Sequence, residues 1–132
     1  MTETEMKLRT KQFALRVLRL AAALPRTIAA DVIRRQVVRS GTAVASGYRA
    51  VCRAKSGADF AYKLRVVEEE ADETALRLEL ITEDKMLPGG QVTPLLKEAD
   101  EITAMMVSAQ KTARGLRPPA GPKSKIQIPK SA

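Results

Sequence analysis

The chain has 132 residues, of which 45% are hydrophobic, 29% charged and 3% aromatic, and it carries a formal net charge of +8 with no histidine. This length accommodates one domain with a substantial core, and the scarcity of aromatic residues favours a helical core of Leu, Val, Ile, Ala and Met. Without histidine, zinc ligation and acid–base catalysis at neutral pH lack their usual residue, so we expect no cofactor, no metal site and no catalytic residue.

The first predicted helix covers about residues 7–24. Its apolar residues recur at spacings of four, three and four along one stripe: Phe13, Val17, Leu20 and Leu24. Pro25 ends this helix, because the residue before a proline is pushed out of the helical conformation. Thr27 then offers an N-cap for a second helix that reaches about residue 55.

The second predicted helix is unusually small in its middle. Its core stripe is Ile33, Val37, Ser40, Val44, Gly47, Val51 and Ala54. Gly41 and Gly47 each lower helix propensity by about 1 kcal/mol relative to alanine. The close approach of a neighbouring helix is the expected compensation.

A third predicted helix begins after Ser56, which together with Asp59 resembles a capping arrangement. This helix reaches about Met86. Its core stripe repeats the spacing of four and three residues: Phe60, Leu64, Val67, Ala71, Thr74, Leu78 and Ile81.

The fourth predicted helix follows a loop at 87–90, with Thr93 as its N-cap, Pro94 as its first residue and Gly115 at its end. Four amphipathic helices joined by short turns pack most simply as an up-down-up-down bundle. We therefore expect an all-α four-helix bundle over residues 1–116. The remaining residues, 117–132, hold four prolines and four basic residues, and we expect a disordered basic C-terminal tail there.

Cysteine usage and hydropathy indicate the compartment. The single cysteine, Cys52, cannot form an internal disulfide and is expected to be a buried, unreactive thiol. The N-terminus has no signal-like apolar run, and no stretch approaches the roughly 18 apolar residues of a membrane span. We expect a soluble, cytoplasmic protein without a membrane partner.

The charge is distributed unevenly along the chain. Residues 1–55 contain 12 basic and 3 acidic residues, and residues 56–114 contain 7 basic and 12 acidic residues. The side of the second helix opposite its core stripe is polar and carries Arg35, Arg39, Thr42, Ser46, Arg49 and Arg53. Arginine donates in a fork that suits phosphate, so these arginines, with Arg16 and Arg19 of the first helix, are the candidate nucleic-acid-binding residues. A merely solvated cationic face is the alternative interpretation.

The third helix is apolar on a second side. Opposite its core stripe lie Tyr62, Val66, Glu69, Glu73, Leu76 and Leu80. One face packs inside the bundle, so we expect the other to contact a second copy of the chain. Glu69 and Glu73 of one copy would meet arginines of another copy. Some of the arginines on the second helix would then form a subunit contact rather than a nucleic-acid-binding face.

A set of residues on the second and third helices resembles a known family. They are Arg39, Ser40, Gly47, Tyr48, Arg49, Lys55, Ser56, Asp59, Phe60, Lys63, Leu64, Glu70, Ala71, Glu73, Thr74 and Leu78. The chain resembles, over roughly residues 13–113, the four-helix bundle proteins first noticed as open reading frames inside intervening sequences of bacterial large-subunit ribosomal RNA genes. Members are similar in fold to the accessory variability protein of diversity-generating retroelements, a basic pentameric bundle that binds nucleic acid and a reverse transcriptase.

The resemblance implies a pentamer of four-helix bundles with a basic surface and no known enzyme activity. The chain departs from the usual pattern at residues 44–47, which read Val, Ala, Ser, Gly where a polar residue such as Asn is typical. It departs again at Ala75 and Leu76, which replace an aromatic pair. These differences would alter the subunit contact or the pore.

The expected function is therefore binding rather than catalysis. The first hypothesis is a homo-oligomer that binds RNA or DNA with steep salt dependence and little sequence specificity, because Tyr48 is the only aromatic residue expected near the arginine row. The alternative is a scaffold that docks an acidic or nucleic-acid-bound protein, such as a reverse transcriptase. An enzyme that uses Glu69, Glu70 and Glu73 as metal ligands is the weakest hypothesis, because di-metal sites in bundles pair glutamate with histidine.

Overall fold

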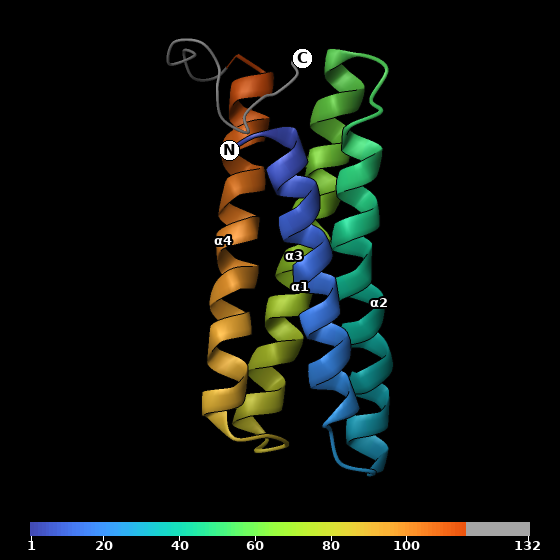
Figure 1. Ribbon diagram of the computed structural model, residues 1–132, viewed down its shortest axis with the longest axis vertical. Coiled ribbons are helices and arrows are strands. Elements are labelled where there is room, and N and C mark those ends of the chain that lie inside the picture. The colour runs from blue at the N-terminus through green and yellow to red at the C-terminus, as the bar shows by residue number, and fades with distance from the viewer. Residues whose placement is uncertain (116–132) are drawn as a thin grey trace.

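The computed structural model describes residues 1–115, which form four helices: α1 (Glu3–Ala22), α2 (Ile28–Val51), α3 (Gly57–Glu83) and α4 (Gly89–Ala113). Successive helices run in opposite directions alongside one another (Figure 1), which confirms the predicted all-α, up-down-up-down bundle. The tail predicted over residues 117–132 lies outside the described residues.

The predicted apolar stripes form the core. On α1, Phe13 and Val17 are at most 1% exposed. The other three helices contribute large, fully buried side chains: Val37, Val44, Val51, Leu64, Val67, Leu78, Ile81, Ile102 and Met106. Burying one such side chain stabilises the fold by about 1.5–3 kcal/mol relative to leaving it exposed. For the first three helices, helical spacing alone thus located the core correctly.

Two glycines of α2 let neighbouring helices approach closely. A Cβ atom at Gly41 would lie 2.7 Å from a Cγ atom of Val17 on α1, and a Cβ atom at Gly47 would lie 3.0 Å from Cγ2 of Val67 on α3. Carbon atoms in good contact are about 3.5–4.0 Å apart. The prediction that small residues of the second helix make room for other helices is therefore confirmed.

A buried hydrogen bond fixes α2 against α3. The hydroxyl groups of Ser40 and Thr74, both fully buried, are hydrogen-bonded at 2.7 Å. The Thr74 hydroxyl also lies 2.8 Å from the carbonyl oxygen of Glu70 in its own helix. The Ser40 hydroxyl would otherwise be unpaired in an apolar core, so the bond favours one register between the two helices.

α1 begins at Glu3, four residues before its predicted start. Thr2 and Glu5 form a capping box: the Thr2 hydroxyl accepts from the Glu5 N–H at 3.0 Å, and the Glu5 carboxylate accepts from the Thr2 N–H at 2.8 Å. The extra turn places Met6 in the core, fully buried. The predicted boundary was wrong because it followed the apolar stripe and overlooked the capping pattern.

The ends of α2 and α3 come earlier than predicted, at Val51 and Glu83 rather than at about residue 55 and Met86. After α3 the backbone turns through Lys85, whose φ of 58° lies in the left-handed region. The N–H of Met86 then donates to the carbonyl oxygen of Ile81 at 2.9 Å. This hydrogen bond closes the end of the helix and reverses the chain.

α4 begins at Gly89, ahead of the predicted N-cap at Thr93. Pro88 occupies the N-cap position, and Pro94, predicted to be the first helical residue, lies inside the helix. Val92 is fully buried and holds these first turns on the core. Pro94 is exposed, so its ring and its missing N–H lie on the solvent side, where they disturb the helix least.

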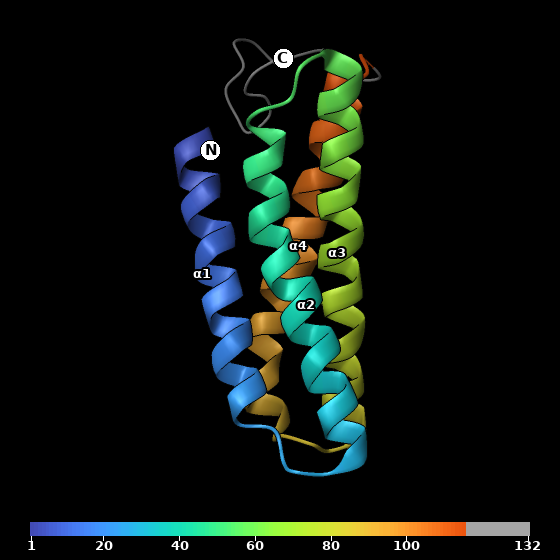
Figure 2. The same cartoon turned by 90° about the vertical axis from the view of Figure 1, so that its right-hand side faces the viewer.

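α1 is the least embedded helix of the bundle. α3 packs along both α2 and α4, whereas α1 packs along α2, lies next to α4 over a shorter stretch and is diagonally opposite α3, with which it shares the core. Figure 2 accordingly places α1 and α3 on opposite sides of the bundle. Arg9 ties α1 to α4 by donating to Glu98 at 2.6 and 2.7 Å and to Glu101 at 2.7 Å. These contacts, chiefly the hydrogen bond to Glu98, raise the pKa of Arg9.

Candidate nucleic-acid interface

The outer side of α2 carries a row of exposed arginines. Arg35, Arg49 and, just beyond the helix end, Arg53 point away from the buried side of α2. Within residues 1–115, none of these three arginines forms an ion pair. Along the helix axis the row from Arg35 to Arg53 spans about 27 Å. We call these three residues the α2 arginine row.

Arg39 lies on the same helix but is engaged within the chain. Its guanidinium nitrogen is 3.1 Å from Glu70 Oε1 and 3.0 Å from Glu73 Oε1, both on α3. The hydrogen bond to Glu70, followed by the negative charge of that carboxylate, raises the pKa of Arg39. Glu73 also pairs with Arg77, so the carboxylate predicted to meet arginines of another copy already has partners in its own chain.

Arg16 and Arg19, the other two predicted binding residues, lie apart from the α2 arginine row. Both line a hollow of about 260 Å³ between α1 and α4, together with Gln91 and Leu95 of α4. The hollow is on the side of α1 that faces α4, whereas the row lies on the outer side of α2. The six predicted arginines therefore form two separate basic surfaces, with Arg39 withdrawn from the first by its ion pairs.

Tyr48 does not lie beside the arginines, which corrects the sequence-based expectation. It is 2% exposed in the core, and burial raises the pKa of its phenol. Cys52, one turn further along, is half-buried. Burial, followed by a hydrogen bond with Glu3 and the charge of that carboxylate, raises the pKa of Cys52 to about 11. Both groups are therefore neutral near pH 7, and Tyr48 cannot stack on a base.

Many of the residues that carry the family resemblance serve the fold. The Ser56 hydroxyl caps α3 by accepting from the Asp59 N–H at 3.0 Å, as predicted. Asp59 accepts in turn from Lys63 Nζ at 2.8 Å and from the Lys55 N–H at 3.0 Å. These bonds, chiefly the one from Lys63, lower the pKa of Asp59. Arg49 is different, since it is exposed and has no ion-pair partner in residues 1–115.

The outer face of α3 is apolar and exposed in the single chain. Tyr62 and Leu76 are 55% and 52% exposed, Leu80 is 41% exposed, and Val66 is half-buried. Glu69 lies on this face and pairs with Arg65 of its own helix at 3.5 Å. The sequence correctly placed these side chains opposite the core, and their contact with a second copy stays a prediction.

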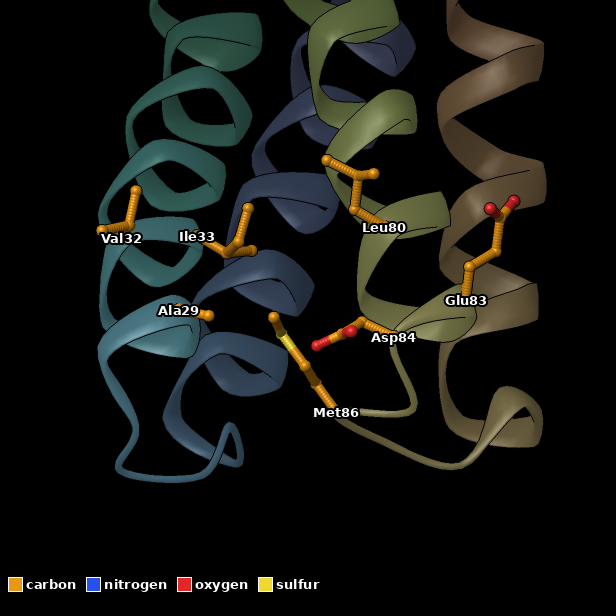
Figure 3. Close-up of a pocket in the computed structure, with 7 residues that line it drawn as sticks. All are labelled: Ala29, Val32, Ile33, Leu80, Glu83, Asp84 and Met86. Carbon is orange, nitrogen blue, oxygen red and sulfur yellow. The ribbon is translucent and has the colours of Figure 1, made fainter.

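An apolar groove adjoins this face at the end of the bundle where α3 finishes. It has a volume of about 620 Å³ and is lined by Ala29, Val32, Ile33, Leu80, Glu83, Asp84 and Met86. Figure 3 shows the α2 side chains and Leu80 across the groove from one another, with Met86 below and the two carboxylates on the α3 side. Sequence reasoning identified Leu80 but missed the groove, because the groove depends on how α2 and α3 are paired.

Sequence reasoning also missed an apolar strip on α1. Leu8, Leu15 and Leu18 are between 41% and 55% exposed and lie opposite the buried stripe of that helix. Spacings of seven and three residues place them on one side of a helix. The signal was therefore readable in the sequence.

The three glutamates considered as metal ligands lie in ion pairs with arginines. Residues 1–115 contain no group of three or more Cys, Asp and Glu side chains arranged to hold a metal ion. Glu70 and Glu73, considered above as metal ligands, instead face Arg39. None of the four described helices is both long and apolar enough to cross a membrane.

Comparison with known proteins gives one family and a solved structure. A family model described as 23S rRNA-intervening sequence protein matches residues 2–108. The chain is similar to a crystal structure from Bacteroides thetaiotaomicron, described as a protein of unknown function from the S23 ribosomal protein family. The two are 30% identical with a TM-score of 0.77, over 84% of this chain and 99% of that one. No curated protein matches the chain.

Proposed function

The chain belongs to the 23S rRNA-intervening sequence protein family, and from that premise we propose that it is a non-enzymatic homo-oligomer that binds RNA or DNA through its basic surface without reading base sequence. The solved relative is itself described as a protein of unknown function. The proposal therefore rests on the surface of this chain. The pentamer implied by the resemblance is the assembly we propose.

The α2 arginine row is the observation that carries the proposal. Glu69, Glu70 and Glu73 of α3 pair with Arg39, Arg65 and Arg77. Within residues 1–115 they leave Arg35, Arg49 and Arg53 without ion pairs. An exposed guanidinium without a carboxylate partner gains most from a phosphate, since no existing pair has to be broken. Each additional copy in an oligomer would repeat the row and raise the affinity for a long polyanion.

The lack of aromatic residues near the row supports binding without sequence preference. Tyr48 is buried, and Tyr62 lies on α3 with Arg65 over its ring at 5.4 Å. No base-stacking platform therefore accompanies the arginines in the described chain. Contacts to the backbone of the nucleic acid position a protein but carry no sequence information.

The test is the salt dependence of binding, measured by fluorescence anisotropy with a labelled single-stranded RNA and with a duplex DNA. We expect the affinity of the wild-type protein to fall steeply as the salt concentration rises. Each phosphate contact contributes about 0.9 to the slope of log K against log salt. The triple variant Arg35→Gln/Arg49→Gln/Arg53→Gln should therefore reduce this slope by up to about 3 per bound copy. The matched control removes three charges from another surface: Lys97→Gln/Lys111→Gln/Arg114→Gln. Equal losses from both variants would mean that only total charge matters and would contradict an interface on α2.

The second candidate function is a scaffold for an acidic or nucleic-acid-bound protein. The exposed apolar side chains on α1 and α3 favour it, because such surfaces commonly mark sites of protein contact. In this case the wild-type protein would form oligomers yet leave both oligonucleotides unbound at low salt. A reverse transcriptase is a partner of this kind that the family resemblance suggests.

A further inference from the structure

α1 presents a basic and apolar surface that the bundle does not use. Leu8, Leu15 and Leu18 form an exposed strip about 15 Å long. Lys11 lies among these leucines by helical geometry, and Lys7 lies beside them. Between residues 6 and 22 the helix holds five basic residues and no acidic one. We call this surface the α1 face.

On the opposite side of the bundle, α3 presents an acidic and apolar surface. Leu76 and Leu80 are exposed, and Leu80 leads into the groove, where Val32 is 42% exposed. Glu79, Glu83 and Asp84 are exposed beside these side chains, and the exposed Lys85 follows Asp84. We call this surface, with the groove, the α3 face.

On both faces, several charged groups near the apolar side chains lack partners. In residues 1–115, Lys7 and Lys11 form no ion pair, and neither do Glu79, Glu83 and Asp84. Two of these three carboxylates line the groove (Figure 3). Acidic groups outnumber basic ones on the α3 face, where Lys85 and Arg35 lie nearby, and the α1 face carries only basic groups, so the two faces are of opposite net charge.

We propose that the α1 face of one copy docks on the α3 face of the next copy, so that the oligomer is built from head-to-tail contacts. The occupant of the groove is a second copy of this chain, because the chain itself carries the surface that complements the groove. The inference rests on the proposed homo-oligomer and specifies its contact. It differs from the sequence-based expectation, which assigned the contact to α3 and to arginines of α2.

Charge argues against a symmetric contact that uses one face twice. In a contact between two α1 faces, lysines would repel lysines, and in a contact between two α3 faces, carboxylates would repel carboxylates. An α1 face and an α3 face attract each other, so the contact between unlike faces is favoured over both symmetric contacts. α1 and α3 lie on opposite sides of the bundle and their outer faces point apart, so one copy can use both faces at once. Contacts of this kind repeat from copy to copy and close into a ring when the rotation allows.

The test uses two variants that each damage one face: Leu15→Glu on the α1 face and Leu80→Lys on the α3 face. We expect light scattering after size exclusion to give a mass near 14.4 kDa for each variant alone. A mixture of the two should give a 1:1 dimer, since each variant keeps one intact face. Ala104→Glu, on the exposed side of α4, is the matched control and should keep the wild-type mass.

The outcomes separate this inference from the proposed function. A monomeric wild-type protein would overturn both. A wild-type oligomer that survives Leu15→Glu, or a mixture that stays monomeric, would overturn only the head-to-tail contact. A second pair of variants, which exchanges surface charges only, guards against misfolding. Lys11→Glu and Glu83→Lys should each weaken assembly at least tenfold. The double variant should recover most of the lost affinity, because the attraction between the two faces is restored with its signs exchanged. No recovery would count against the contact.

Discussion

The α2–α3 contact and the α1–α4 contact are built differently. Between α2 and α3, Gly47 admits Val67, and Ser40 bonds to Thr74 inside the core. Between α1 and α4 the contact is shorter, and its polar link is Arg9, which is 24% exposed in its side chain. Many of the residues that carry the family resemblance lie at the first contact. These residues therefore explain the fold more than the function. The unpaired charges on the outer faces of α1, α2 and α3 are available for contacts with other molecules.

The largest expected effect breaks the α2–α3 contact from inside. Thr74→Val removes one hydroxyl and leaves Ser40 buried without its partner, which should lower the free energy of unfolding by about 2 kcal/mol. Ser40→Ala/Thr74→Val removes both hydroxyls and should be more stable than Thr74→Val alone. Urea denaturation at one protein concentration measures both. A double variant less stable than the single would show that the hydroxyl pair does not couple the helices.

The next effect tests the close approach of α1 to α2. Gly41→Ala gains helix propensity of about 1 kcal/mol but places a methyl group 2.7 Å from a Cγ atom of Val17, a fully buried β-branched side chain. Overpacking costs about 1–3 kcal/mol, so we expect a net loss of about 1 kcal/mol in the free energy of unfolding. Gly57→Ala is the control, because no atom lies within 4 Å of its added Cβ. Equal effects of the two changes would contradict a steric origin.

The third effect should be confined to α1. Arg9→Ala breaks the link to Glu98 and leaves that carboxylate, 16% exposed, without its cation. We expect a loss of about 1 kcal/mol, within the range for hydrogen bonds to charged groups after allowance for partial exposure. Native-state hydrogen exchange should speed up for α1 amides and not for α3 amides. Lys97→Ala, an exposed residue without an ion pair in residues 1–115, should change neither rate.

The same comparison explains what the sequence could predict. Core positions such as Val37, Leu64 and Leu78 follow from spacing, because a helix with one apolar stripe must turn it inward. Tyr48 was also readable, since it lies four residues after Val44 on the buried side. The start of α4 was not, because the burial of Val92 outweighs glycine and proline signals in a way that only the packed bundle reveals.

The candidate site was less predictable than the fold. Helical spacing puts Arg35 and Arg39 on the same outer side of α2. The rotation of α3 and its register along α2 together decide that Glu70 and Glu73 reach Arg39 and not Arg35. Whether an arginine is available to a ligand is thus a property of the pairing of two helices, and one helix read alone cannot supply it.

The smallest expected effect reports on how α1 covers the end of α2. Because the pKa of Cys52 is about 11, only about 0.1% of the thiol is ionised at pH 8. Alkylation by iodoacetamide should therefore quicken about tenfold per pH unit between pH 7 and 10, with circular dichroism checking that the fold persists. Glu3→Gln removes a negative charge that disfavours the thiolate, so it should shift the profile to lower pH by less than one unit. An inflection near pH 8.5, the value of a free thiol, would mean that the first turn of α1 does not stay over Cys52, and the least embedded helix would then also be frayed at its start.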